Sequence, residues 1–190
     1  MGKSKKSLKP RLYLDIDGVL NSTVGDQIAK KKFPEDMNLL AENLLAHKYL
    51  LYKHWHEPSV NALRHVLETI KPEIYIHSTW KNHFELEDFT TFFNHWNLDA
   101  SLIKGIVPRY KFSSERYHDL SWHIGGDRIG DDDTIACHNY VVLDDIDMTY
   151  VFEERDVFKT RQLVCNPEVG FTQEQAEQAI ALFKKNSTES

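Results

Sequence analysis

Two apolar segments, separated by more than a hundred residues, run into acidic residues. Leu12–Leu14 continues into Asp15–Gly18, in which two aspartates flank an isoleucine, and Tyr140–Leu143 continues into Asp144–Asp145. Short apolar runs bounded by turn residues are typical of buried strands. Because parallel strands present their carboxyl ends at one edge of a sheet, we expect the four carboxylates to lie at that edge. The chain must therefore bring two distant segments into one sheet.

The rest of the chain alternates between helical and strand-like patterns of apolar residues. The expected helices are Glu35–Leu45, Pro58–Ile70, Leu86–Trp96, Ser113–Ile124 and a last helix that opens on the capping box Thr172–Gln175. Further short strands are expected at Glu73–His77, Leu102–Val107 and Leu163–Cys165. Strands that alternate with helices predict a three-layer, Rossmann-like α/β domain, with a mainly parallel sheet and helices on both faces.

The length and composition predict one globular domain in a reducing compartment. The 190 residues include 41% hydrophobic and 27% charged residues, which are ordinary values for a globular protein. We expect a basic flexible tail at residues 1–10, a single domain at 11–185 and a disordered end at 186–190. Two cysteines, no cleavable signal peptide and no transmembrane segment indicate a cytoplasmic protein, with export by a route without such a signal left open.

Four carboxylates at one edge of a sheet repel one another unless a cation lies among them. Oxygen ligands select hard cations, and Mg²⁺ in particular is bound by few carboxylates together with water and phosphate. A metal-bound carboxylate at Asp15 would be ionised and available as a nucleophile, while Asp17, on the same side of an extended chain, handles protons. The structural alternatives are an acidic turn at Asp15–Asp17 and a solvated loop at Asp144–Asp145.

Three segments resemble motifs of the haloacid dehalogenase-like (HAD) phosphatases. Leu14–Leu20 is similar to the first motif, Ile76–Ser78 to the second and Val142–Asp145 to the fourth. With Ser78–Trp80 and Asn166–Thr172, the chain looks closest to the HAD domains of Swiss Army Knife RNA-repair proteins and their stand-alone bacterial relatives. The resemblance covers most of the chain and implies a HAD-like fold.

The resemblance also implies a two-step phosphatase mechanism. Asp15 would attack phosphorus and form an aspartyl-phosphate. Asp17 would protonate the leaving oxygen and then deprotonate the water that hydrolyses the intermediate. Superfamily members that are ATPases carry Thr at the position of Asp17, so this residue favours the hydrolysis of phosphate esters.

The ligands of metal and phosphate follow from the same resemblance. Mg²⁺ would be bound by Asp15, the backbone carbonyl of Asp17, and one or both of Asp144 and Asp145. The implied phosphate ligands are Ser78 and Lys111, with Lys104 and Arg116 as alternatives for the lysine of the third motif. His77 is expected to point to the face of the sheet opposite Ser78.

The segments after the first and second motifs are too short for a large cap domain. Residues 21–55 leave room for a flap and a helix, and residues 81–110 mostly for one helix and a strand. A minimal cap, or none, suits a phosphate that protrudes from a large molecule. Trp80, directly after the second motif, is weighed as facing the substrate against a place in the core.

The net charge of −6 favours a phosphoprotein over a nucleic acid as this large molecule. Aromatic side chains near the site would also accept a phosphotyrosine ring. The RNA-repair resemblance favours the alternative, a phosphatase of nucleotides or polynucleotide ends. A reading of another class is a catalytically silent HAD-like binding module.

Overall fold

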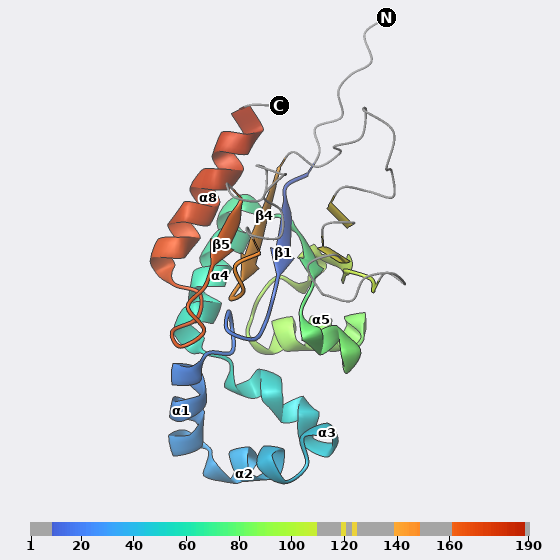
Figure 1. Cartoon of the computed structure of the whole chain (residues 1–190), viewed down its shortest axis with the longest axis vertical. Helices are drawn as coiled ribbons and strands as arrows, with labels where there is room; N and C mark the ends of the chain where they lie inside the picture. The colour runs from blue at the N-terminus through green and yellow to red at the C-terminus, as the bar shows by residue number, and fades with distance from the viewer. Residues whose placement is uncertain (1–8, 110–118, 121–122, 125–138, 149–160, 189–190) are drawn as a thin grey trace, which may run out of the picture.

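The side chains of strand β1 (Arg11–Leu14) alternate between the two faces of a parallel sheet. Leu12 and Leu14 belong to one buried apolar cluster, and Tyr13 belongs to a second cluster. The computed structural model describes residues 9–109, 119–120, 123–124, 139–148 and 161–188. Within them, five strands form one sheet in the order β3-β2-β1-β4-β5 (Figure 1). The other strands are β2 (Glu73–Ile76), β3 (Ile103–Ile106), β4 (Tyr140–Asp144) and β5 (Gln162–Val164).

All four strand pairings are parallel, and the central three strands end at the same level. Leu14 pairs with Ile76 of β2 and with Leu143 of β4. The ladder continues one residue further, because Asp15 N donates to Leu143 O at 3.0 Å and His77 N donates to Leu14 O at 3.1 Å. The residues that follow these strands therefore meet at one carboxyl edge, and the predicted α/β class is confirmed.

Helices α4 (Glu57–Ile70) and α8 (Gln173–Thr188) pack against each other beside the sheet (Figure 1). The capping box predicted before α8 is present: Thr172 Oγ1 accepts from Gln175 N, and Gln175 Oε1 accepts from Thr172 N, both at 3.2 Å. Apolar residues of both helices join the larger buried cluster, together with Leu12 and Leu14. These residues are Val60, Ala62, Leu63, Val66, Leu67, Ala176, Ala179, Ile180 and Phe183.

Helix α5 (Leu86–His95) places its aromatic stripe in the same cluster. The helix begins at a reciprocal capping box between Glu85 and Asp88, in which Glu85 N donates to Asp88 Oδ2 at 2.8 Å. Phe92 packs edge-on against Trp80, with ring centroids 6.1 Å apart, and the aromatic side chains Phe89, Phe92 and Phe93 are buried in the core. The aromatic helix therefore supports the segment that follows β2.

Between β1 and α4 the chain makes a helical excursion beyond the carboxyl ends of the strands (Figure 1). The excursion consists of α1 (Thr23–Lys32), α2 (Pro34–Glu42), α3 (Leu44–His47) and the 3₁₀-helix η1 (Lys48–His54). The sequence pattern predicted a flap and one helix, Glu35–Leu45, in this segment. The structure has an additional helix, α1, and the predicted helix is divided at Asn43, the C-cap of α2.

Local signals explain why α1 forms although its apolar pattern is weak. Ser22 caps the helix by accepting a hydrogen bond from Gly25 N at 3.1 Å. Asp26 lies in the first turn and Lys30–Lys32 in the last, so both charge types complement the helix dipole. Only Gly25 and Ala29 are buried, which leaves little apolar periodicity for a sequence pattern to detect.

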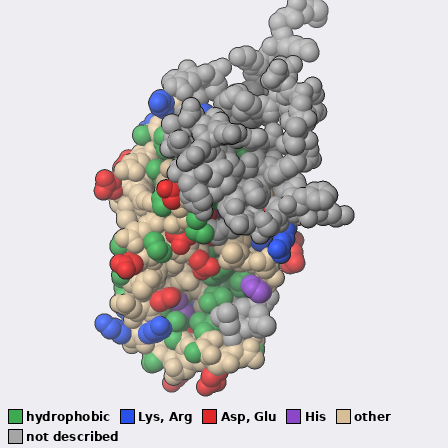
Figure 2. Space-filling model, viewed as in Figure 1, with side chains coloured by type: hydrophobic (Ala, Val, Ile, Leu, Met, Phe, Trp, Pro, Cys, Tyr) green, Lys and Arg blue, Asp and Glu red, His purple; other side chains and the backbone are tan. Residues whose placement is uncertain are grey.

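The excursion forms a small cap without a buried cluster of its own among the described residues. Its buried apolar residues Ala29, Leu40 and Leu50 belong to neither cluster. Leu51 and Tyr52 attach it to the larger cluster. Figure 2, viewed from the same side as Figure 1, shows acidic, basic and apolar side chains interspersed over the described part of the surface that faces the viewer. In the described part of the chain, the segment after the first motif therefore forms only a minimal cap, as its length predicted.

The second buried cluster covers the other face of the sheet. In it, Tyr13 and Val142 of the sheet meet Leu120, Ile124 and Met148. Most of the helix predicted at Ser113–Ile124 lies outside the described residues, as do residues 1–8 and 189–190, and the predicted domain bounds stay predictions. None of the helices in the described ranges is long and apolar enough to span a membrane.

Candidate active site

A tight turn follows β1 and brings the first acidic pair to the carboxyl edge. Ile16 O accepts hydrogen bonds from the N–H groups of Val19, Leu20 and Asn21 at 2.8–3.2 Å. Gly18 has a φ of +69°, in the left-handed region that glycine adopts without strain. Asp15 precedes this turn in line with the strand, and Asp17 lies within it.

Gly18 also lies directly against Asp145, which follows β4. A Cβ atom on residue 18 would overlap Asp145 Oδ2 and lie 2.5 Å from the Cβ and Cγ atoms of that side chain. Both the positive φ and the lack of a side chain are therefore needed for the turn after β1 to meet the end of β4.

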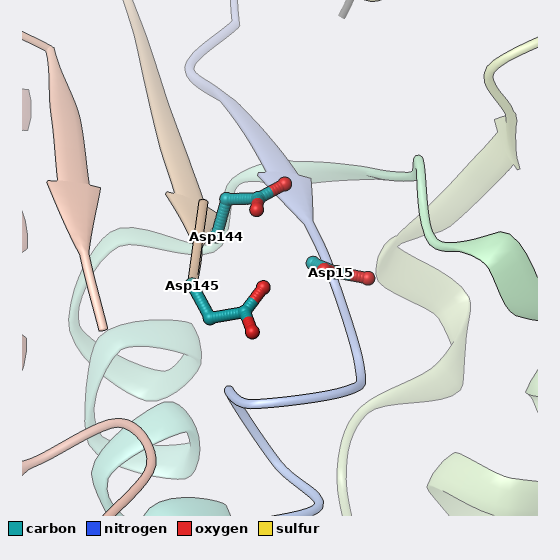
Figure 3. A group of neighbouring side chains, drawn as sticks. All are labelled: Asp15, Asp144 and Asp145. Carbon is teal, nitrogen blue, oxygen red and sulfur yellow. The ribbon is translucent and has the colours of Figure 1, made fainter. Parts of the chain in front are cut away.

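Asp15, Asp144 and Asp145 form one group of carboxylates. One oxygen of each lies within 4.8 Å of the others, and Figure 3 shows Asp144 and Asp145 pointing from the end of β4 toward the end of β1, where Asp15 lies. Asp15 and Asp144 are fully buried, and Asp145 is half-buried. Backbone donors orient two of them, because Ile16 N donates to Asp15 Oδ1 and Ile146 N donates to Asp144 Oδ1, each at 2.8 Å. The predicted convergence is therefore present.

The negative charge of this group affects the pKa of a neighbouring thiol, that of Cys165. Burial and then the charges of Asp144, Asp145 and Asp15 raise the pKa of Cys165, so the thiol is neutral. Three carboxylates this close favour a cation among them, and an all-oxygen donor set at partly buried positions fits a hard divalent ion such as Mg²⁺. The residues present therefore fit the metal that the sequence pattern implies.

His77 lies beside the acidic group, and its predicted orientation relative to Ser78 stays a prediction. His77 Nε2 lies 3.5 Å from Asp144 Oδ2, and both side chains are fully buried. The side chain extends across the end of β1, because β2 and β4 flank that strand. The available signal in the sequence was a histidine directly before Ser78, within the second motif.

Asp17 is held by three side chains. Trp80 Nε1 donates to Asp17 Oδ1 at 2.9 Å, and Asn21 Nδ2 donates to the same oxygen at 3.4 Å. Thr79 Oγ1 donates to Asp17 Oδ2 at 3.5 Å. Trp80 and Thr79 belong to the 3₁₀-helix η2 (Thr79–Asn82), directly after the second motif. The side chain of Trp80 is core and is only 6% exposed, which excludes the open substrate-facing surface considered for it.

Asp26 adds a further acid from the excursion. Burial raises its pKa, Asp17 raises it further, and Lys30 and His54 act in the opposite direction. No sequence motif points to this residue, because it belongs to the ordinary acidic first turn of a helix.

Only some of the expected phosphate ligands lie within the described residues. Ser78 is fully buried at the end of β2, and its Oγ accepts a hydrogen bond from Trp80 N at 3.3 Å. Lys111 and its alternative Arg116 lie outside the described residues. The other alternative, Lys104, is exposed on β3, and its Nζ donates to Ser101 O at 2.7 Å. The identity of the phosphate-binding lysine therefore stays a prediction.

One cation close to the second motif was not predicted. Lys81 Nζ donates to Asp119 Oδ2 at 3.0 Å and to Val107 O at 3.2 Å, with both charged side chains largely buried. The pair joins the 3₁₀-helix η2 to the helical residues near Leu120. It was missed because nothing in the sequence couples two residues 38 positions apart.

The parallel sheet and the aspartates at the ends of β1 and β4 define a HAD-like α/β domain. A family model described as "HAD domain in Swiss Army Knife RNA repair proteins" matches residues 11–176, and the chain belongs to this family. No curated protein and no solved structure matches the chain. Membership supports phosphatase or hydrolase activity in general, and HAD domains generally use Mg²⁺.

Proposed function

We propose that the chain is a Mg²⁺-dependent phosphatase that hydrolyses phosphomonoesters through an aspartyl-phosphate at Asp15. The observation that carries the proposal is the convergence of Asp15, Asp144 and Asp145 at one edge of the sheet, with Asp17 two residues beyond the nucleophile. A structural acidic turn would not require a second acidic pair, from another strand, at the same place. The family match supports the same reaction class.

Each residue of the site has a distinct role in this reaction. Asp15, Asp144, Asp145 and the backbone carbonyl of Asp17 would bind Mg²⁺, which supplies positive charge for the phosphate oxygens. A carboxylate oxygen of Asp15 attacks phosphorus while the bond to the leaving oxygen breaks. Asp17 gives its proton to that oxygen and later takes one from the water that hydrolyses the intermediate. Ser78 and Lys111 remain the proposed phosphate ligands.

The small cap supports a substrate that is itself large. A helical excursion without its own core offers little enclosure, so the rest of a macromolecule would complete the exclusion of water. The net charge of −6 favours a phosphoprotein, including one that carries phosphotyrosine. A polynucleotide end is the second candidate, because the matching family is described from RNA repair proteins.

Hydrolysis of a nitrophenyl phosphate by the purified chain tests the reaction. The proposal expects turnover that requires Mg²⁺ and is lost in Asp15→Asn, which preserves the shape of the side chain. Turnover that persists in Asp15→Asn would contradict the mechanism, and a folded chain without turnover would favour the binding-module alternative. Rates on phosphopeptides and on oligonucleotides with a terminal phosphate then decide between the two substrate classes.

A further inference from the structure

The proton-transferring carboxyl group has one strong, buried hydrogen-bond donor. The bond from Trp80 Nε1 to Asp17 Oδ1 measures 2.9 Å, whereas the contacts from Asn21 and Thr79 measure 3.4 and 3.5 Å. At these lengths only the indole bond lies near the optimum for N–H donors. The orientation of Asp17 therefore depends chiefly on Trp80 among the described residues.

The indole ring is itself rigidly held. Its centroid lies 5.3 Å from that of Phe84, 6.0 Å from that of Trp55 and 6.1 Å from that of Phe92. The backbone N–H of Trp80 donates to Ser78 Oγ, and this bond anchors the residue to the end of β2. A ring packed in this way has a single direction for its N–H group.

From this geometry we infer that Trp80 is a positioning residue for proton transfer by Asp17, an inference that rests on the proposed phosphatase activity. An indole N–H can only donate, so it keeps Oδ1 of Asp17 as an acceptor in both protonation states of the carboxyl group. The acidic proton is thereby assigned to Oδ2. Thr79 is the neighbour of that oxygen, and its hydroxyl can donate or accept as the state requires.

The assignment fixes the path of the proton in each step. In the first step a carboxylate oxygen of Asp15 bonds to phosphorus as the bond to the leaving oxygen breaks. The electron pair of the broken bond stays on the leaving oxygen, and the proton on Asp17 Oδ2 moves to it. In the second step water attacks phosphorus, Asp17 Oδ2 accepts the water proton, and the bond between phosphorus and Asp15 breaks. Trp80 keeps its proton throughout and acts only by holding Asp17.

Leaving-group dependence tests this role, because only poor leaving groups need a well-placed acid. We expect Trp80→Phe to lower kcat/KM for an alkyl phosphate such as phosphoserine peptide by about tenfold to a hundredfold, part of the usual contribution of general acid catalysis. For nitrophenyl phosphate the loss should be at most about threefold, since nitrophenolate departs without a proton. The ratio kcat/KM is the right measure, because it reports only steps up to the first transfer.

Trp55→Phe is the matched control. Trp55 lies in the same aromatic cluster and is 2% exposed, but its Nε1 has no hydrogen-bond partner in the described part of the chain. The substitution makes the same change in core volume without removing a bond to Asp17. We expect this variant to lower kcat/KM for both esters only slightly and by the same factor.

A spectroscopic measurement tests the hydrogen bond without relying on activity or on the folding of Trp80→Phe. The chain has four tryptophans, so the indole N–H region of a proton–nitrogen spectrum contains four signals that can be assigned by elimination. Asp17→Ala should move the Trp80 signal upfield and leave that of Trp55 in place.

The outcomes separate this inference from the proposed function. A wild-type chain without Mg²⁺-dependent turnover of either ester would overturn the proposed function and the inference with it. If the wild type is active and Trp80→Phe lowers kcat/KM for both esters by the same factor, the inference alone would be overturned. A Trp80 signal that stays in place in Asp17→Ala would do the same.

Discussion

Gly18 and Asp145 are packed so closely that a Cβ atom on residue 18 would overlap the carboxylate of Asp145. The contact joins the turn after β1 to the end of β4, and therefore joins the two halves of the acidic group. It also makes glycine necessary at this point, because φ is +69° and a side chain would force Asp145 away from Asp15 and Asp144.

We therefore expect Gly18→Ala to lower both stability and Mg²⁺ binding. The left-handed conformation alone costs about 1 kcal/mol for a residue with a Cβ atom. Urea unfolding measures the stability, and the Mg²⁺-induced rise in Tm measures binding. Gly105→Ala is the control, because a Cβ there would lie at an ordinary 3.6 Å from Tyr75. Equal behaviour of the two variants would contradict the close packing at Gly18.

Repulsion among the carboxylates predicts opposite effects of Asp145→Asn with and without metal. Without Mg²⁺ the variant should have a higher Tm than the wild type, because one of three adjacent negative charges is removed. With Mg²⁺ the rise in Tm should shrink, because a ligand is lost. Glu168→Gln, which removes the same charge from an exposed position, should leave the Mg²⁺ response unchanged. A full Mg²⁺ response in Asp145→Asn would remove this residue from the metal site.

The ion pair of Lys81 with Asp119 should be important for stability. Lys81→Met removes one partner of a buried pair, and such changes cost about 3 kcal/mol. The free energy of unfolding in urea is the measurement. Lys184→Met, at an exposed position of α8, should change it by less than about 0.5 kcal/mol. A loss at Lys81 no greater than at Lys184 would show that the pair contributes nothing.

Much of the fold could be predicted, because the elements that form it are patterned by burial. The strands β1 and β4 are built on the short apolar runs Leu12–Leu14 and Tyr140–Leu143, and α4 carries an apolar stripe between a proline start and a Lys-Pro end. Helix α1 could not be predicted, because it lies on the surface and is specified by the Ser22 cap rather than by apolar periodicity. Surface helices lack the apolar signal that sequence patterns detect.

Part of the site could also be predicted, namely the group of acids at the strand ends. Acids at strand ends are placed by topology, so Asp15, Asp144 and Asp145 could be expected to converge. The contacts of Trp80 with Asp17 and of His77 with Asp144 depend on how side chains pack after the strands end, and no spacing in the sequence encodes that. Such partners are found only when the three-dimensional arrangement is known.

The raised pKa of Asp26 predicts a pH dependence with a definite sign. Because burial raises its folded-state pKa above the ordinary 3.8, the folded chain holds this proton to higher pH than the unfolded chain does. The contribution of Asp26 to stability is therefore lost as the pH rises through that window. Asp26→Asn should raise Tm at neutral pH, and the gain should fade below the ordinary pKa.

The control for this prediction is Glu35→Gln, an exposed acid in the first turn of the neighbouring helix α2. It removes the same charge from the first turn of a helix, at a position that is not buried. Its Tm should change little, or fall slightly through the lost interaction with the helix dipole. If Asp26→Asn behaved in the same way at neutral pH, burial of Asp26 would have no energetic effect.

The most direct test of the central claim is to locate the covalent intermediate. The chain is mixed with an aryl phosphate and Mg²⁺, quenched in acid during turnover and reduced with borohydride, which converts an aspartyl-phosphate into homoserine. Peptide mass spectrometry should find homoserine at position 15, dependent on Mg²⁺ and on substrate. Turnover with no modification at Asp15, or with modification at another residue, would contradict the assignment of Asp15 as the nucleophile.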